Sequence, residues 1–256
     1  MGFRIIIPAR YASARLPGKP LREIAGRPMI AHVVERARES DAEAVTVATD
    51  DERIAEVAAA LGVDVCMTSP DHASGTERIA EVIERRAIPD EAVLVNLQGD
   101  EPLMPGVCLN QVGHALETDP EAVMATLSAP IEAAREIDDW HVIKVIVDAH
   151  GNAIYFSRAP IPWHRESFGE QSADGLNEAL AGGHYLRHIG LYGYRAGFVK
   201  QYVAWGPCAL EALESLEQLR VLYNGQRIKV VPAARIPGPG VNNADELARV
   251  AAILGR

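Results

Sequence analysis

The amino-acid sequence predicts an α/β fold whose core is a doubly wound, mostly parallel sheet. Short apolar runs of strand length alternate with amphipathic helical patterns through the first half of the chain. This alternation is typical of right-handed strand–helix–strand crossovers, which build a parallel sheet covered by helices on both faces. The 256 residues are 48% hydrophobic and 5% aromatic. This composition indicates a folded chain with a sizeable core and excludes a disordered one.

Strands and helices are expected to alternate from the N-terminus onward. The predicted buried strands are Ile5–Pro8, Ala44–Thr49, Val63–Met67, Val93–Leu97 and Val123–Leu127. Apolar residues at i, i+3, i+4 and i+7 predict a helix over 30–37, where Pro28 favours the first turn, and another over 54–61. A third helix is expected after Ser74, which fits a capping box with Glu77.

A change of pattern near Trp140 predicts a lobe that extends the sheet. This lobe covers about residues 140–205 and belongs to a single domain of residues 1–256. Residues 141–158 alternate in the manner of a β-hairpin whose turn lies at 148–152. No Pro/Gly-rich linker separates the lobe from the first half, so we expect an extension of the same sheet.

Three further elements are expected in the second half. The polar, Gly-bearing segment 167–183 indicates a mobile surface loop. Amphipathic spacing predicts one continuous helix over 209–225, and a last helix is expected after Asn243.

Charge and cysteine content narrow the classes of function. The chain has 25 Lys and Arg against 35 Asp and Glu, which argues against a nucleic-acid partner, because such binding depends mainly on Lys and Arg. No apolar run approaches the roughly 20 residues that span a bilayer, so no membrane partner is expected. Cys66, Cys108 and Cys208 are widely spaced, which disfavours disulfides and structural zinc and favours a cytoplasmic location.

A cationic loop follows the first predicted strand. Arg10, Arg15 and Lys19 lie beside Gly18 and two prolines, at the strand end where open parallel sheets bind ligands. Guanidinium and ammonium groups bind phosphate oxygens well. Any one such cation is solvated by default, so charge alone leaves phosphate binding and solvation as alternatives. The chain has neither the GxxxxGK(S/T) nor the GxGxxG pattern, which disfavours a P-loop protein and a dehydrogenase.

An acidic loop follows the fourth predicted strand. In NLQGDEP, Asp100 and Glu101 come directly after the strand and Pro102 ends the turn. Mg²⁺ binds through one or two protein carboxylates together with substrate phosphates, whereas an acidic turn without a ligand is the alternative. The helix start at Ser74 offers free backbone N–H groups as well as a cap. Together these loops predict a site for a nucleoside triphosphate with magnesium.

Seven motifs run in order from about residue 4 to residue 250. They are IIIPARYASARLPGKPL, ATDD, SGTER, VNLQGDEP, YFSRAPIPW, RHIGLYGYR and LEQLRVL. As a set they resemble the 3-deoxy-manno-octulosonate cytidylyltransferases, or CMP-Kdo synthetases. The resemblance implies a nucleotide-diphospho-sugar transferase-like fold, with a smaller dimerisation extension and a homodimer. It also implies the reaction of CTP with 3-deoxy-manno-octulosonate (Kdo) to give CMP-Kdo and pyrophosphate, for lipopolysaccharide biosynthesis.

The resemblance implies roles for individual residues. It gives nucleotide binding to Arg10, Arg15, Lys19, Ser74, Gly75 and Gln98, catalysis to Lys19, Asp100 and Arg15, metal binding to Asp100, and sugar-acid binding to Arg158, His184, Tyr185 and Glu211. Near the C-terminus the family's second metal-binding Asp is replaced by Asn242 in GVNNADEL. The second ligand is therefore left open between Asn242 and Asp245, and a segment that only caps the last helix is the third alternative.

Three other kinds of protein share part of this pattern. A cytidylyltransferase for a related sugar acid, an 8-amino Kdo variant or sialic acid, has the same first half and a different sugar pocket. A non-catalytic nucleotide-binding regulator is disfavoured because Arg10, Arg15, Lys19 and Asp100 are all present. The H-x3-H pair that ends at His188 lies in a strand-like pattern, which argues against zinc because i and i+4 are then too far apart.

Overall fold

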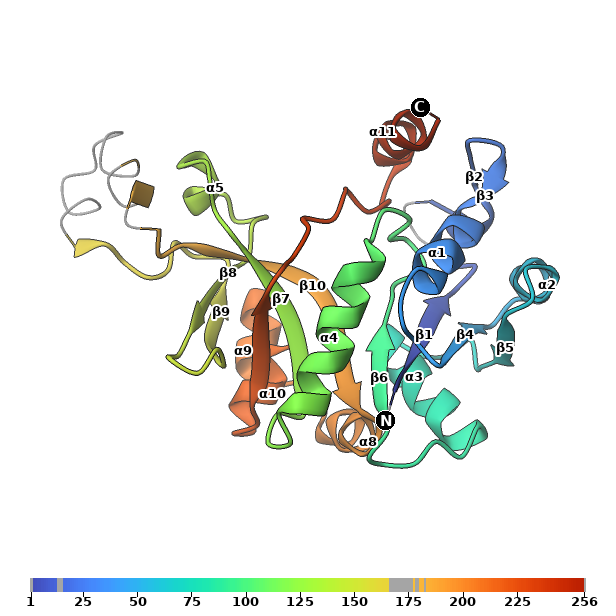
Figure 1. The fold of residues 1–256 in the computed structure, drawn as a ribbon, viewed down its shortest axis with the longest axis horizontal. Coiled ribbons are helices and arrows are strands. Elements are labelled where there is room, and N and C mark those ends of the chain that lie inside the picture. The colour runs from blue at the N-terminus through green and yellow to red at the C-terminus, as the bar shows by residue number, and fades with distance from the viewer. Residues whose placement is uncertain (1, 13–15, 166–176, 178–179, 182, 256) are drawn as a thin grey trace.

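A computed structural model describes residues 2–12, 16–165, 177, 180–181 and 183–255 (Figure 1). Within that part, one sheet of nine strands runs in the order β11-β7-β10-β6-β1-β4-β5, and the hairpin of β8 and β9 joins it at β10. The strands are β1 (Phe3–Ala9), β4 (Ala44–Thr49), β5 (Asp64–Met67), β6 (Val93–Asn96), β7 (Met124–Pro130), β8 (Lys144–Val147), β9 (Ala153–Ser157), β10 (Leu186–Arg195) and β11 (Ile228–Pro232). A separate ribbon pairs β2 (Glu23–Ile24) with β3 (Arg27–Pro28).

The alternation predicted for the first half is confirmed. All five expected strands form, and β6, β1, β4 and β5 are parallel neighbours. The α-helices that lie within the described residues are α1 (Met29–Arg38), α2 (Glu52–Ala60), α3 (Gly75–Arg85), α4 (Gly106–Thr118), α5 (Arg135–Asp138), α8 (Ala196–Trp205), α9 (Ala209–Glu214), α10 (Leu219–Tyr223) and α11 (Ala244–Leu254). The expected fold class, an α/β fold with a mostly parallel sheet, is confirmed.

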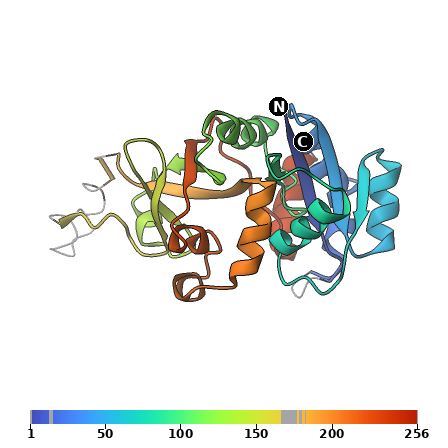
Figure 2. The same cartoon turned by 90° about the horizontal axis from the view of Figure 1, so that it is seen from below.

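The sheet is covered by helices on both faces, as the strand sequences require. In β1, Ile5 and Ile7 belong to a core shared with α1, α2 and α4, whereas Ile6 belongs to a second core shared with α3 and α8. Consecutive strand residues point to opposite faces, so a strand that is apolar throughout demands cover on both sides. Figure 2, seen along the sheet, shows α4 on one side and α8 with α3 on the other.

One long strand interrupts the parallel order. β10 lies between β6 and β7 and is antiparallel to both, and its pairing with β7 changes register between Ile189 and Tyr192. This irregularity bends the strand. In consequence, Gly190, Tyr192 and Tyr194 line the cavity described below.

The continuous helix predicted over 209–225 is wrong. The chain forms α9 and α10, separated by residues 215–218, and Ser215 adopts a left-handed conformation with a φ of 52°. Arg158 explains the break: its Nε donates to the carbonyl oxygen of Glu214 at 2.6 Å and its backbone N–H to the Glu214 carboxylate at 2.9 Å. Helical spacing alone does not show that a distant guanidinium takes a carbonyl that a continuous helix would use.

The predicted lobe begins with the hairpin of β8 and β9, which turns at 148–152 as expected. This hairpin lies at the far end of the sheet from β5 (Figure 1). Most of the predicted surface loop 167–183 lies outside the described residues. Among the described helices, none is both long enough and apolar enough to cross a bilayer.

Candidate active site

A cavity of about 580 Å³ opens at the carboxyl ends of β1 and β6. The start of α3, the bent middle of β10 and the break at 215–218 contribute the rest of its wall. Seven residues predicted for the site line it: Arg10, Lys19, Ser74, Gly75, Gln98, Asp100 and Asn242. Segments far apart in the sequence thus meet at one point, as expected for strand ends in an open α/β sheet. Arg15 lies outside the described residues.

Lys19 and Asp100 form an ion pair in this cavity. The Lys19 Nζ lies 2.6 Å from Asp100 Oδ2 and also donates to the carbonyl oxygen of Val241 at 3.0 Å. Gly18 turns the chain just before Lys19 with a φ of 66°, which glycine adopts at little cost. The Lys19 side chain is only 15% exposed, so it is not a solvated loop cation. The pair joins the cationic and the acidic loop that the sequence predicted separately.

Asn242 lies beside this pair. The backbone N–H of Val241 donates to the carbonyl oxygen of Asp100 at 2.9 Å, which brings the segment to the cavity. The neighbouring Asn243 caps α11 by accepting from the Glu246 N–H at 2.9 Å. The capping alternative therefore applies to Asn243, whereas Asn242 lines the cavity and Asp245 is an exposed residue of the first turn of α11.

The donor set fits a hard cation. Mg²⁺ prefers oxygen ligands, and the Asp100 carboxylate and the Asn242 amide both line the same cavity. Among the described side chains, no group of three or more His, Cys, Asp or Glu residues is placed to hold a metal by itself. A metal at this position would therefore depend on substrate phosphates for its remaining ligands.

Glu101 adds a second carboxyl next to Asp100. Burial, reinforced by the Asp100 charge, raises the pKa of Glu101 to about 8. At neutral pH the Glu101 side chain is therefore mostly protonated, whereas Asp100 forms the ion pair with Lys19. The position of the two carboxyls after the strand does not distinguish them, and the resemblance gave the metal-binding role to Asp100 alone.

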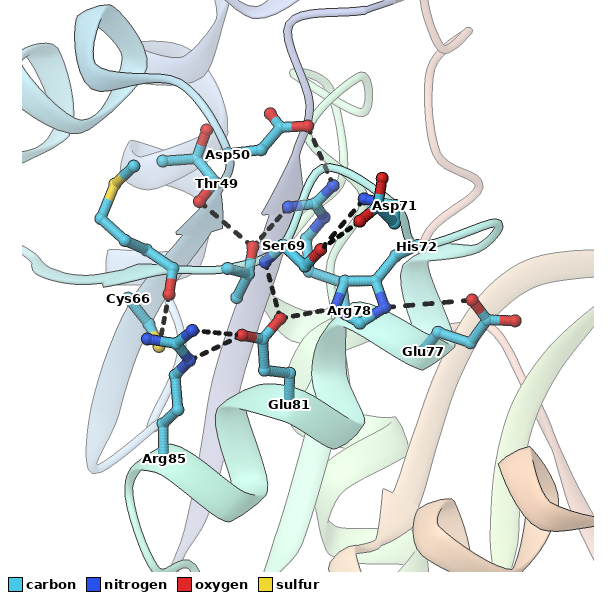
Figure 3. Close-up of polar contacts among 12 residues, drawn as sticks. Thr49, Asp50, Cys66, Ser69, Asp71, His72, Glu77, Arg78, Glu81 and Arg85 are labelled. Atoms are coloured by element: carbon cyan, nitrogen blue, oxygen red, sulfur yellow. Dashed lines mark hydrogen bonds and ion pairs between the residues drawn. The ribbon is translucent and has the colours of Figure 1, made fainter.

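The turn before α3 forms the other side of the cavity (Figure 3). Ser74 caps α3, with its Oγ accepting from the Glu77 N–H at 3.2 Å, and the Glu77 carboxylate accepts from the Ala73 N–H at 2.8 Å. The predicted cap is confirmed. Gly75 lies against Gln98, since a Cβ at Gly75 would come within 3.2 Å of the Gln98 Nε2. A larger residue at position 75 would press on Gln98.

His72 lies in the same wall and is held by Glu81. The two side chains are 2.5 Å apart, from Nε2 to Oε2, and the same Glu81 oxygen accepts from the Ser69 N–H at 2.8 Å (Figure 3). Arg85 donates to the other Glu81 oxygen at 2.6 Å. Burial opposes ionisation of Glu81, but hydrogen bonds from His72, Ser69 and Arg85 lower its pKa to about 2. Glu81 thus closes the 69–72 turn onto α3.

The four residues predicted for the sugar acid are not brought together in this cavity. Arg158 donates to backbone carbonyls of Glu214 and Trp140. Tyr185 is 2% exposed, packs with Ile131 and Ile137, and donates its hydroxyl to the Pro162 carbonyl at 2.7 Å. His184 is exposed. Glu211 forms a two-point ion pair with Arg220, at 2.6 and 2.7 Å. Their sugar-binding roles stay predictions.

Residues other than those four line the part of the cavity formed by β10 and the break at 215–218. Tyr192, Glu217 and Gln218 line the cavity there. Gln218 is only 3% exposed, its Oε1 accepts from the Tyr192 hydroxyl at 3.3 Å, and its Nε2 is buried without a hydrogen-bond partner among the described residues. Buried donors are normally satisfied, so the Gln218 amide N–H is suited to a ligand. Tyr192 and Gln218 belong to the motifs RHIGLYGYR and LEQLRVL, but the resemblance implied sugar binding by Arg158, His184, Tyr185 and Glu211 instead.

Comparison with known proteins adds a separate line of evidence. A cytidylyltransferase family model matches residues 4–228. The chain is 52% identical over 254 residues to 3-deoxy-manno-octulosonate cytidylyltransferases of Histophilus somni strains 129Pt and 2336, with 99% of each protein covered. It is similar to a solved CMP:2-keto-3-deoxy-manno-octonic acid synthetase complexed with CTP, at a TM-score of 0.87 and 38% identity over 99% of this chain and 98% of that one. A cytidylyltransferase of Leptospira borgpetersenii serovar Hardjo-bovis (strain JB197), at 16% identity and a TM-score of 0.57 over 92% of this chain and 77% of that one, shares the fold alone.

Proposed function

The chain belongs to the 3-deoxy-manno-octulosonate cytidylyltransferase family, and from this premise we propose how its cavity carries out the reaction. The enzyme transfers the cytidylyl group of CTP to Kdo and releases pyrophosphate, which activates the sugar for lipopolysaccharide biosynthesis. The observation that carries this function is the 52% identity over 99% of the chain, supported by the meeting of Lys19, Asp100 and Asn242 in one cavity. Nothing favours the 8-amino Kdo variant or sialic acid.

The reaction is a displacement at the α-phosphorus of CTP by the anomeric hydroxyl of Kdo. Such reactions depend on positioning and charge neutralisation. Lys19 and Arg10 lie where they can bind the triphosphate, and Ser74 and Gly75 present the start of α3 to the base. Lys19 is held by Asp100 and by the Val241 carbonyl. Its ammonium is therefore fixed in place before charge develops on the leaving pyrophosphate, which favours the transition state.

Magnesium is part of the proposal. Asp100 and Asn242 would hold the ion, because both offer oxygen ligands to the same cavity. A bound Mg²⁺ would withdraw charge from the phosphates and lower the pKa of the attacking hydroxyl. Since Asp100 is bound by Lys19 at 2.6 Å, the Lys19 ammonium would then share Asp100 with the ion or move toward the phosphates.

The sugar acid is expected to bind along β10 and the break at 215–218. The Gln218 amide N–H donates to a sugar oxygen, and the Tyr192 hydroxyl holds that amide in the required orientation. Burial raises the pKa of Tyr192 well above its usual value. Its hydroxyl therefore stays a donor at any physiological pH, which keeps Gln218 aligned for the sugar.

A cytoplasmic homodimer is the proposed form of the enzyme. Trp140, Ile154 and Trp163 are each more than half exposed, at 59%, 58% and 64%, and all three belong to the predicted dimerisation lobe. Large apolar side chains left exposed favour a protein contact. β9 pairs with β8 in the described sheet, and a bridge between Asn152 and Lys229 joins its start to β11, so the exposed apolar side chains are the part of the lobe that suits a second copy of this chain.

Pyrophosphate release tests the function. We expect rapid release only with CTP and Kdo, when the four nucleoside triphosphates are each combined with Kdo, an 8-amino Kdo variant and sialic acid. EDTA is expected to abolish turnover and added Mg²⁺ to restore it. Equal turnover with UTP or ATP would contradict the assigned substrate, and undiminished turnover in EDTA would contradict the metal.

A further inference from the structure

Asp50 joins two elements of the cavity without lining it. It follows β4 directly, and its side chain is 8% exposed. Its Oδ1 accepts from the Tyr11 N–H at 3.3 Å, next to Arg10 in the loop after β1. Its Oδ2 lies 3.2 Å from the Nη2 of Arg78, in the first turns of α3 (Figure 3). One carboxylate thus binds the start of the phosphate-binding loop and the helix that carries the base-binding turn.

Arg78 is the residue through which Asp50 reaches the cavity. Its side chain is 3% exposed, yet it is one of the lining residues. Its Nη1 donates to the hydroxyl of Thr68, and that hydroxyl donates in turn to the Thr49 carbonyl at 3.1 Å. The Arg78 backbone N–H is bonded to the Ser74 carbonyl at 3.3 Å. The guanidinium is therefore held from behind, one helical turn after the Ser74–Gly75 pair.

The ion pair between Asp50 and Arg78 is buried, so its stability depends on both partners being present. A buried charge that loses its partner is left uncompensated, so removal of one partner costs far more than removal of a surface charge. Asp51, the next residue, has a different role: it caps α2 and pairs with Arg53, which is 58% exposed. The ATDD motif therefore contains one carboxylate that caps a helix and one that lies between two ligand-binding elements.

We propose that Asp50 is a positioning residue that sets the spacing between the phosphate-binding and base-binding halves of the CTP site by holding Arg78 and the Tyr11 backbone. This inference rests on the proposed function only for the identity of the nucleotide. Asp50 binds the Tyr11 backbone and Arg78, whereas Gln218 is held by Tyr192, so loss of Asp50 is expected to weaken CTP far more than Kdo.

The first test is Asp50→Asn. The amide keeps the size of the side chain and an oxygen for Tyr11, but it removes the charge that faces Arg78. We expect the Kd for CTP, measured by isothermal titration calorimetry, to rise about tenfold or more, as is typical when a hydrogen bond to a charged group is lost. The KM for Kdo should stay within about twofold of the wild type. Asp64→Asn, the same charge change at an exposed ion pair with Arg86, is the control and should change neither constant.

Thr68→Val keeps the test decisive if Asp50→Asn does not fold. Thr68 holds Arg78 from the opposite side and does not line the cavity, so its variant should weaken CTP selectively and by a smaller factor. An equal change in the constants for CTP and Kdo, or a lower unfolding temperature with both constants unchanged, would overturn the proposal. The calorimetric arm needs neither Kdo nor turnover. Failure of wild-type turnover with CTP and Kdo would therefore count against the function and leave the Asp50 result interpretable.

Discussion

Lys19 and Asp100 show how single residues combine charge and position in this cavity. Each comes from a loop whose sequence alone left its function open. The 2.6 Å contact between the two side chains brings both loops to the same cavity. The backbone of Val241 binds both residues and thereby brings the C-terminal segment to the same point. At the residue scale, the proposed chemistry therefore depends on a few side chains that three distant segments hold in place.

Loss of either charge should reduce catalysis more than stability. Lys19→Ala and Asp100→Asn are each expected to lower kcat by about a hundredfold or more, because each removes charge stabilisation in the transition state. Lys200→Ala, which breaks an exposed ion pair with Asp90, is the control and should leave kcat unchanged. The checks are kcat at saturating CTP and Kdo together with thermal unfolding. Lower thermal stability with normal kcat would show that the pair is structural.

Asn242 should determine how much magnesium the enzyme needs. An amide oxygen ligates Mg²⁺ without contributing charge, so Asn242→Asp is expected to lower the free Mg²⁺ needed for half-maximal activity, and Asn242→Ala to raise it. The effect should be moderate, because the triphosphate and Asp100 supply most of the ligand charge. Magnesium titration of wild type and both variants measures it. An identical requirement in all three would reject the ligand role, and a rise in Asp245→Ala alone would move it to Asp245.

At the scale of elements, β10 and the break between α9 and α10 form the second half of the cavity. The long strand crosses the sheet antiparallel to its neighbours and carries His188 among aromatic side chains. His188 lies 4.9 Å from Phe156 and 5.5 Å from Tyr192, centroid to centroid, and its Nε2 is 2.9 Å from the Thr126 hydroxyl. This histidine supports the strand next to the proposed sugar pocket.

The burial of His188 should make the fold sensitive to mild acid. Burial lowers the pKa of His188 to about 3 from the ordinary 6.5. A histidine kept neutral contributes stability above its unfolded pKa, and that stability is lost as pH falls from about 6.5 toward 3. The contribution of His188 to the free energy of unfolding should decrease by up to about 1.4 kcal/mol per pH unit below pH 6. Glu101, whose pKa is raised to about 8, contributes with the opposite sign in this range, so the difference in slope between wild type and His188→Gln isolates the histidine.

Denaturant unfolding between pH 7 and pH 5 measures this slope, before most carboxylates titrate. His188→Gln should be less stable at pH 7 and should show a smaller slope, because the glutamine does not protonate. His141→Gln removes an exposed histidine and should keep the wild-type slope. If the slopes of wild type and His188→Gln coincide, the charge state of this strand does not govern stability in acid.

At the scale of the whole molecule, one sheet with two apolar faces supports the cavity, and the lobe lies at its far end. Figure 1 shows the β8–β9 hairpin and α5 extending away from the β1–β4–β5 end. The lobe carries the exposed side chains of Trp140, Ile154 and Trp163. Such a surface is costly for a monomer in water, which supports the proposed dimer.

Assembly should therefore depend on the lobe. Light scattering is expected to give about twice the 27.7 kDa chain mass for the wild type. Ile154→Asp, at a side chain of β9 that is 58% exposed, should shift the protein toward one chain, because a buried carboxylate opposes association. Ile253→Asp alters a 48% exposed side chain on α11 and should leave the mass unchanged. A wild type of single-chain mass, or an Ile154→Asp variant that still pairs fully, would contradict this interface.

The sequence by itself determined the sheet, the loops at its edge and most of the residues that line the cavity at the ends of β1 and β6. Strand alternation, the cap at Ser74 and the charges of Lys19 and Asp100 are local signals, because each depends on side-chain type and spacing within a few residues. Parallel strands bring their carboxyl ends to one edge, so loops after β1 and β6 had to meet. That is why Arg10, Gln98 and Asp100 were placed correctly in the cavity.

The tertiary structure alone decided the other half. Whether 209–225 stays one helix depends on Arg158, which binds the Glu214 carbonyl from 56 positions away, and no local pattern encodes that contact. The break turns Gln218 into the cavity, while Glu211 pairs with Arg220. Likewise, Asp50 and Asp51 are adjacent carboxylates that only burial distinguishes. The spacing of residues along a helix or strand determines the face on which each side chain lies. Contacts between distant segments determine which of these faces lines the cavity.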